Sequence, residues 1–127
     1  MASEFVCILN KTFNRPGLPA IALTTDTSIL TAFANDFQFE GIFKRQVQAL
    51  GKPNDLLIGI YTSGNSKNVV AALKIAKSLK LHTLALTGEN GVLPKMADVA
   101  ISVPSSNTQY IQETLLSIEH ILCEIVE

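Results

Sequence analysis

The sequence has few charged residues and no long apolar run, and each shortage excludes a class of protein. Charged residues make up 17%, and ten Lys and Arg nearly balance eleven Asp and Glu, for a net charge of −1. We therefore expect no electrostatically driven binding to nucleic acid or to an acidic membrane surface. The apolar runs are far shorter than a membrane span. The first residues lack a basic cluster and include Glu4, which argues against a signal peptide.

Cysteine is also scarce. The two cysteines, Cys7 and Cys123, lie near opposite ends of the chain. A small disulfide-stabilised domain normally has more cysteines at regular spacing. We therefore expect both to be reduced, buried thiols in a cytoplasmic protein.

Apolar residues are plentiful by comparison. They make up 47% of 127 residues, which suffices for the core of one domain and leaves no room for a second. Four short apolar runs stand out, at Ala20–Thr24, Leu56–Tyr61, Thr83–Thr87 and Val99–Val103. They are nearly continuous rather than alternating, which is typical of strands in a parallel sheet that is covered on both faces.

Segments with helical periodicity lie between these runs. One is Phe39–Leu50, which Gly51 and Pro53 should end, and another runs from about Ser66 to Lys80. The last segment has an apolar stripe with alternating spacings of four and three, formed by Ile111, Leu115, Ile118, Leu122 and Ile125. The stripe could face the chain's own sheet or a helix of a second subunit. The alternation of strands and helices predicts an α/β fold with a doubly wound, three-layer parallel sheet of about four strands.

Ligands of such sheets bind beyond the carboxyl ends of the strands. The segment there with the most suitable chemistry is Thr62-Ser63-Gly64-Asn65-Ser66, which follows a strand and begins a helix. Free N–H groups at a helix start attract an anion, and the hydroxyls of Thr62, Ser63 and Ser66 add donors. Because no Walker lysine follows, a small phosphorylated molecule is a better candidate ligand than a nucleoside triphosphate. The alternative is ordinary turn and helix-cap chemistry.

At this point the sequence resembles a known family, the sugar isomerase (SIS) domain proteins, and within it the phosphoheptose isomerases. The matching stretches are Arg15–Leu23, Asp26–Ser28, Asn35–Phe37, Thr62–Ser66, Leu86–Gly88, Ile111–Glu113 and His120–Leu122. The resemblance implies a flavodoxin-like parallel sheet. It also implies conversion of sedoheptulose 7-phosphate to D-glycero-D-manno-heptose 7-phosphate, which supplies heptose for bacterial lipopolysaccharide. The family forms cytoplasmic homotetramers, commonly with one zinc ion at each site.

The resemblance implies roles for particular residues. Glu4 falls at the position of the catalytic glutamate, and His120 at that of its partner acid or base, so the two would move the proton through an enediolate. For Glu4 alone the alternative is a solvated helix residue, and for His120 a structural histidine at a helix interface. His82, at the start of a strand, has no such match and is expected to be structural.

Three further positions follow from the same comparison. Asp26 would contact the sugar hydroxyls, although it could equally cap the following helix. Gln112, eight residues before His120 and so about two turns away along one helix, would contact the substrate. Zinc would take Glu4, Gln112 and His120, an incomplete set that should bind the metal poorly. Tyr61 stands where relatives usually have a serine, which would narrow the pocket or replace that serine's contact.

The family also has an additional N-terminal segment, with a helix, a first strand and a glycine-rich loop that contacts the sugar phosphate. We therefore expect residues 1–127 to be a single SIS domain that is truncated at its start. Two other functions were weighed. One is a non-enzymatic SIS protein such as the replication-initiator adaptor, which lacks the catalytic pair. The other is a sugar-phosphate-sensing regulatory domain, which would normally be fused to a DNA-binding segment.

Overall fold

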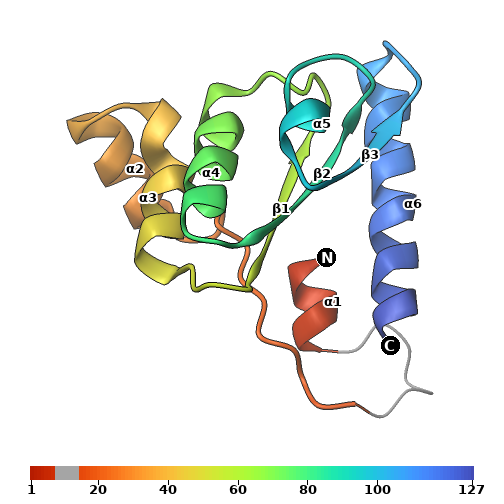
Figure 1. Cartoon of the computed structure of the whole chain (residues 1–127), viewed down its shortest axis with the longest axis horizontal. Coiled ribbons are helices and arrows are strands. Elements are labelled where there is room, and N and C mark those ends of the chain that lie inside the picture. The colour runs from red at the N-terminus through yellow and green to blue at the C-terminus, as the bar shows by residue number, and fades with distance from the viewer. Residues whose placement is uncertain (8–14) are drawn as a thin grey trace.

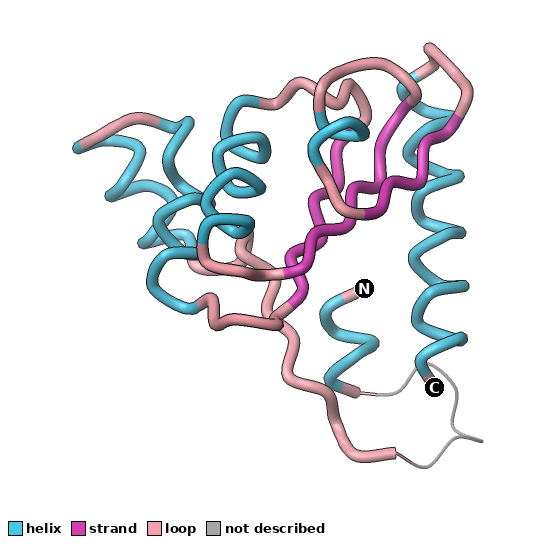
Figure 2. The backbone as a smooth tube through the Cα atoms, viewed as in Figure 1, coloured by secondary structure: helices cyan, strands magenta, loops and turns pink. Residues whose placement is uncertain are grey.

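Three parallel strands form the centre of the structure, a computed structural model that describes residues 1–7 and 15–127. Helices pack on both faces of these strands (Figures 1 and 2). The elements in chain order are α1 (Ala2–Val6), α2 (Thr27–Asp36), the 3-10 helix η1 (Phe39–Gly41), α3 (Ile42–Leu50), β1 (Leu56–Tyr61), α4 (Lys67–Ser78), β2 (His82–Gly88), α5 (Leu93–Met96), β3 (Val99–Val103) and α6 (Thr108–Val126).

The sheet has the order β1-β2-β3, and both pairings are parallel. Leu56 lies opposite His82, and Leu84 opposite Val99. The central strand β2 is the most deeply buried of the three, since its last four residues are all buried. Neighbouring residues of a strand point to opposite faces, so both faces of β2 need an apolar cover.

The two layers of helices supply that cover. On one face, Ala85 of β2 packs with Leu73 of α4 and Leu93 of α5. On the other face, Leu86 packs with Ile111 and Leu115 of α6. Helix α3 lies outside α4 (Figure 1), and its Val47 joins a third cluster with Ala72 and Ala76. The prediction of a three-layer α/β fold with a parallel sheet is confirmed.

The apolar stripe of α6 faces the chain's own sheet. Ile111 and Leu115 are buried, and Ile118 and Leu122 pack against the same cluster. Only Ile125, at the end of the stripe, is exposed, at 75%. The spacing of the stripe therefore reflects burial within one chain. Among residues 1–7 and 15–127, no helix combines the length and apolarity needed to cross a bilayer.

One predicted strand is not formed. Residues 20–24 run past β1 without pairing to it, and a turn begins at Leu23. The carbonyl oxygen of Leu23 accepts a hydrogen bond from the Gln46 side chain at 3.0 Å, and that of Ala22 accepts one from Thr25. Apolar residues form a strand only where a partner strand lies beside them. Here a groove separates the segment from β1, and the described sheet has three strands rather than four.

The expected burial of both cysteines is half right. Both are free thiols, but Cys7 is exposed whereas Cys123 is buried. Cys7 ends the short helix α1, where no other element covers it. Its burial could not be predicted from residue type alone, because the first helix is held only at its other face.

A polar cluster joins the start of β2 to the residues that precede β3. The Asp98 carboxylate accepts hydrogen bonds from the hydroxyl and the backbone N–H of Thr83 at 2.8 and 2.9 Å. Lys77 of α4 pairs with the same carboxylate at 3.0 Å. Hydrogen bonds from Thr83 and then from Lys77 lower the pKa of Asp98 to about 2. The cluster therefore links α4, β2 and β3 through one ionised side chain.

This lowered pKa predicts an acid-sensitive contribution to stability. A carboxyl with a depressed folded-state pKa stabilises the fold above its unfolded pKa, and the contribution disappears as the pH falls through the folded value. We expect Asp98→Asn to lower the melting temperature at pH 7, and the difference from wild type to shrink as the pH falls from about 4 to about 2.

Melting curves at half-unit steps of pH would measure this difference. Thr83→Val removes one donor to the same carboxylate and should give a smaller effect in the same pH range. A difference between wild type and Asp98→Asn that stays constant down to pH 2.5 would contradict the assignment.

Candidate functional site

The loop Thr62–Ser66 joins the carboxyl end of β1 to the start of α4, as the sequence predicted. Ser66 is the N-cap residue with extended backbone, and its hydroxyl donates to the Asn68 side-chain oxygen at 2.5 Å rather than capping the helix directly. That oxygen also accepts the Val69 N–H. In the described part of the chain, the N–H groups of Lys67 and Asn68 have no hydrogen-bond acceptor. Together with the helix dipole they are available to an anion.

Two glycines shape this loop from both sides. Gly64 has φ +66° and Gly91, in the loop after β2, has φ +108°. A Cβ on Gly64 would collide with the Asn90 carbonyl oxygen, and one on Gly91 would lie 2.6 Å from the Gly64 carbonyl carbon. The Gly64 carbonyl oxygen accepts the N–H groups of Val92 and Leu93, both at 3.1 Å. The two loops therefore hold each other at the carboxyl ends of neighbouring strands.

The predicted hydroxyls occupy different positions in this loop. Ser63 is exposed, and its oxygen accepts the Asn65 N–H at 3.3 Å. Thr62 is half-buried, and its carbonyl oxygen accepts the Gly88 N–H. Ser63 is therefore the hydroxyl that is most accessible to a ligand. Tyr61, the last residue of β1, is 43% exposed.

Sequence analysis missed Thr87, the buried side chain beneath this loop. Thr87 is fully buried in β2, and its hydroxyl has no hydrogen-bond partner in the described structure. Its oxygen lies 3.1 Å from the place where a Cβ of Gly64 would be. A polar residue at the end of an otherwise apolar buried strand was the available signal.

The structure brings Glu4 and His120 together, although they lie near opposite ends of the sequence. Their carboxylate oxygen and imidazole Nε2 are 3.5 Å apart. Glu4 is on α1, which lies beside the C-terminal half of α6 that carries His120 (Figure 1). The Arg15 guanidinium donates to the carbonyl oxygens of Phe5 and Glu4, at 2.9 and 3.1 Å. These bonds anchor the end of α1 and so fix the carboxylate next to the imidazole.

The charge on this carboxylate is also influenced by the chain's amino group. The other oxygen of Glu4 pairs with the Met1 ammonium. The hydrogen bond from that ammonium lowers the pKa of Glu4 below its usual value, and His120 adds a smaller favourable interaction. Glu119 lies 3.7 Å from the same ammonium. Glu4 is therefore ionised at neutral pH.

Asp26 and Gln112 are placed less decisively. The Asp26 carboxylate accepts the Ile29 N–H at 3.0 Å and caps α2, so the structural alternative for this residue is present. Its hydrogen bonds in the described chain all lie within its own helix. Gln112 is exposed on α6, about two turns before His120. A contact of either residue with a sugar stays a prediction.

The described donors do not fit a resident zinc ion. Zinc sites in proteins use three or four side-chain ligands. Across residues 1–7 and 15–127, no group of three His, Cys, Asp or Glu side chains is placed to hold a metal. Glu4 and His120 supply two donors, and one Glu4 oxygen is already paired with the Met1 ammonium. Zinc therefore stays a prediction from the resemblance.

The loop and the Glu4–His120 pair lie at different ends of the molecule. The loop is at the carboxyl ends of the strands, whereas α1 lies near the end of α6 (Figure 1). No described contact joins the two groups. Within this chain the structure thus provides an anion-binding loop and a carboxylate–imidazole pair as two separate components.

Comparison with known proteins matches both components. A family model described as "SIS domain" matches residues 3–88. A curated phosphoheptose isomerase of Roseiflexus sp. (strain RS-1) is 50% identical over 128 residues, which are 100% of this chain and 64% of that protein. One of Aquifex aeolicus (strain VF5) is 53% identical over 128 residues, or 100% of this chain and 66% of that protein.

Solved structures agree. A phosphoheptose isomerase from Francisella tularensis has a TM-score of 0.91 and 41% identity, covering 98% of this chain and 66% of its own. One from Neisseria gonorrhoeae has a TM-score of 0.90 and 42% identity, with the same coverage. The chain thus spans less than two thirds of the length of the Roseiflexus protein and of these solved chains. The family match ends at residue 88, whereas the alignments to relatives also include α6.

The packing of the two glycines predicts the effect of one substitution. Gly64→Ala places a side chain in left-handed backbone against the Asn90 carbonyl, so it should lower the free energy of unfolding by about 1–3 kcal/mol. Chemical denaturation measures this loss. The neighbouring Ser63→Ala, at an exposed position, should change it by less than about 0.5 kcal/mol. Equal stability of Gly64→Ala and wild type would show that the loops are not held as described.

Proposed function

Since this chain belongs to the SIS domain family, we propose that it forms the catalytic part of a phosphoheptose isomerase. The reaction converts sedoheptulose 7-phosphate to D-glycero-D-manno-heptose 7-phosphate. The observation that carries this proposal is the 3.5 Å approach of the Glu4 carboxylate to the His120 imidazole. A chain with only a binding or adaptor role would not need an acid–base pair from two distant segments.

The phosphate of the substrate binds at the start of α4 in this proposal. The free N–H groups of Lys67 and Asn68 and the accessible hydroxyl of Ser63 donate to its oxygens. Thr62 and Ser66 line the same loop. The absence of a bulky side chain at Gly64 lets the phosphate approach the backbone.

The proton transfer itself needs a base beside the carbonyl carbon. The ionised Glu4 carboxylate removes a proton from C1 of the ketose, and the electron pair moves to form an enediolate. His120 donates a proton to the developing O2 and later receives the one from O1. Glu4 then returns its proton to C2, which completes the aldose without any net gain or loss. Asp26 and Gln112 would position the sugar hydroxyls.

Further properties of the family extend this proposal. The chain would act in the cytoplasm, supply heptose for lipopolysaccharide, and assemble as a homotetramer, with zinc bound only where further ligands complete the site. Exposed apolar side chains on the outer face of α6 support assembly, namely Tyr110, Leu116, Ile121 and Ile125. A neighbouring copy is one way for a phosphate loop to approach a Glu4–His120 pair.

The proposed phosphate site can be tested by removing one hydroxyl. In a chain joined to the part of the Roseiflexus relative outside the matched span, Ser63→Ala should weaken binding of sedoheptulose 7-phosphate by about 1.5–3 kcal/mol, the usual loss for a hydrogen bond to a charged group. Titration calorimetry measures this affinity. Ser78→Ala, at the other end of α4, is the matched control. Unchanged affinity for Ser63→Ala would place the phosphate elsewhere.

The acid–base pair predicts a different pattern. In the same extended chain, Glu4→Gln and His120→Gln should each lower kcat by roughly 10²–10⁴-fold, with a much smaller change in substrate affinity. The double variant should be little worse than either single variant, because the two residues act as a unit. Steady-state kinetics with a coupled heptose assay gives these values.

The other histidine provides the control for this experiment. His82 is at the start of β2, where its backbone N–H bonds to the Asp55 carbonyl oxygen, and His82→Gln should leave kcat near the wild-type value. Near-normal kcat in His120→Gln would make that histidine structural, and would favour a non-enzymatic SIS protein instead.

A further inference from the structure

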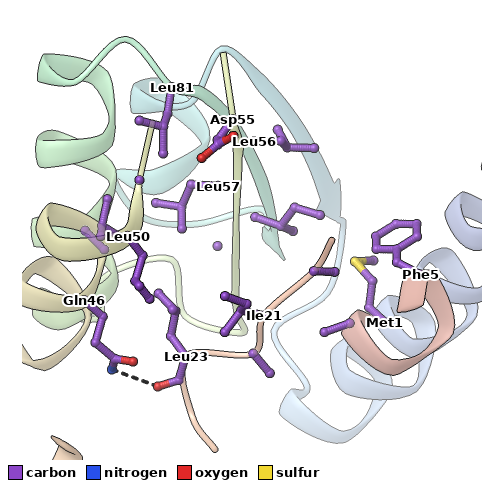
Figure 3. Close-up of a pocket in the computed structure, with 18 of the residues that line it drawn as sticks. Met1, Phe5, Ile21, Leu23, Gln46, Leu50, Asp55, Leu56, Leu57 and Leu81 are labelled. Carbon is purple, nitrogen blue, oxygen red and sulfur yellow. Dashed lines mark hydrogen bonds between the residues drawn. The ribbon is translucent and has the colours of Figure 1, made fainter. Parts of the chain in front are cut away.

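An apolar groove of about 1260 Å³ runs along the outer edge of β1. One wall is β1 itself, and the other is the segment 17–24 that precedes α2. Figure 3 shows Ile21 and Leu23 of that segment across the groove from Leu56 and Leu57 of β1. Ile21 and Leu56 are more than half exposed, at 67% and 56%. The groove thus leaves large apolar side chains in contact with water on both of its walls.

The β1 wall also has an unused hydrogen-bonding edge. In the described sheet β1 pairs with β2 alone, so the N–H and C=O groups on its other side have no strand beside them. Such an edge is a template for another strand. The strand is six residues long, which offers an edge of about 20 Å.

The opposite wall is held away from β1 at both ends. At one end the buried Gln46 side chain donates to the Leu23 carbonyl oxygen at 3.0 Å. At the other, the Leu18 N–H donates to the Phe5 carbonyl oxygen at 3.0 Å, which also accepts from Arg15. These bonds oppose a collapse of segment 17–24 onto β1. The gap is therefore built into the fold.

We propose that this groove is a docking site for one extended, apolar β-strand from a separate polypeptide, added parallel to β1. Both existing pairs are parallel, and the helices on both faces enclose an added strand as they enclose β2. Its backbone completes the edge of β1, and its side chains cover Ile21, Leu23, Leu56 and Leu57. This inference goes beyond the proposed isomerase activity and does not rest on it.

The source to which we commit is the remainder of the relatives' chains. The Aquifex protein aligns with all of this chain through only 66% of its own length. The solved Francisella structure superposes on 98% of this chain and contains a further third of its own. The open edge of β1 and its groove are the place in the described fold where added chain finds both hydrogen bonds and an apolar surface.

Co-expression of two polypeptides tests the proposal. This chain is produced together with the part of the Aquifex relative that lies outside the matched 128 residues, as a separate polypeptide. We expect a one-to-one complex by light scattering. In the complex, hydrogen exchange at the amides of Leu56–Tyr61 should slow by roughly tenfold or more, since buried strand amides exchange only on opening. Exchange in β3, the other edge of the sheet, should stay unchanged.

A matched pair of variants separates this groove from general stickiness. Leu56→Asp puts a charge at the first residue of β1 in the groove, and Val99→Asp puts one at the first residue of β3, outside it. The two side chains are similarly exposed, at 56% and 59%. Leu56→Asp should weaken the complex by roughly tenfold or more, because it buries a charge without a partner, and Val99→Asp should not. Melting temperatures of the isolated variants check that both are folded.

Several results would overturn the proposal. One is the absence of a complex while both polypeptides are soluble. A second is slow exchange of the β1 amides in this chain alone, either as a monomer closed by its own segment or as a dimer of two copies. A third is equal weakening by both variants. None of these readouts depends on catalysis, so failure here would leave the isomerase proposal standing, and loss of activity with an intact complex would have the opposite meaning.

Discussion

The burial of β2 between two layers of helices is the constraint on which the rest of this structure depends. Its alternating side chains need apolar partners on both faces, and α4 with α5 supplies one cover while α6 supplies the other. Once β2 is fixed, its carboxyl end carries the Thr87–Gly91 loop to the Thr62–Ser66 loop, where Gly64 and Gly91 hold each other. The anion-binding geometry at the start of α4 is thus a consequence of strand pairing rather than an independent feature.

Much of this arrangement could be predicted from residue patterns, because the patterns report burial. Continuous apolar runs identified three of the strands, and helical spacing identified α3, α4 and α6. Residues 20–24 have the same composition as a strand, yet they have no strand beside them. A strand is defined by its partner, and composition carries no information about whether a partner exists.

The candidate site shows the same division. The loop at the start of α4 was predictable because one short stretch contains all its chemistry. The closeness of Glu4 and His120 could be expected only through the family resemblance, since the pair depends on how α1 packs against α6. Thr87 was missed because a buried hydroxyl beneath a loop has no local signature. Local motifs can therefore be read from sequence, whereas pairs that span the chain need the fold.

The anchoring of α1 has a consequence for the order of folding. This helix has five residues, too few to persist in water without tertiary contacts. Its place beside α6 depends on Arg15 and on packing between the two ends of the chain. Contacts between such distant residues form after the local ones, because a long loop must first close. The carboxylate and the imidazole therefore meet only in molecules whose sheet and last helix are already in place, which makes their pairing a marker of the completed fold.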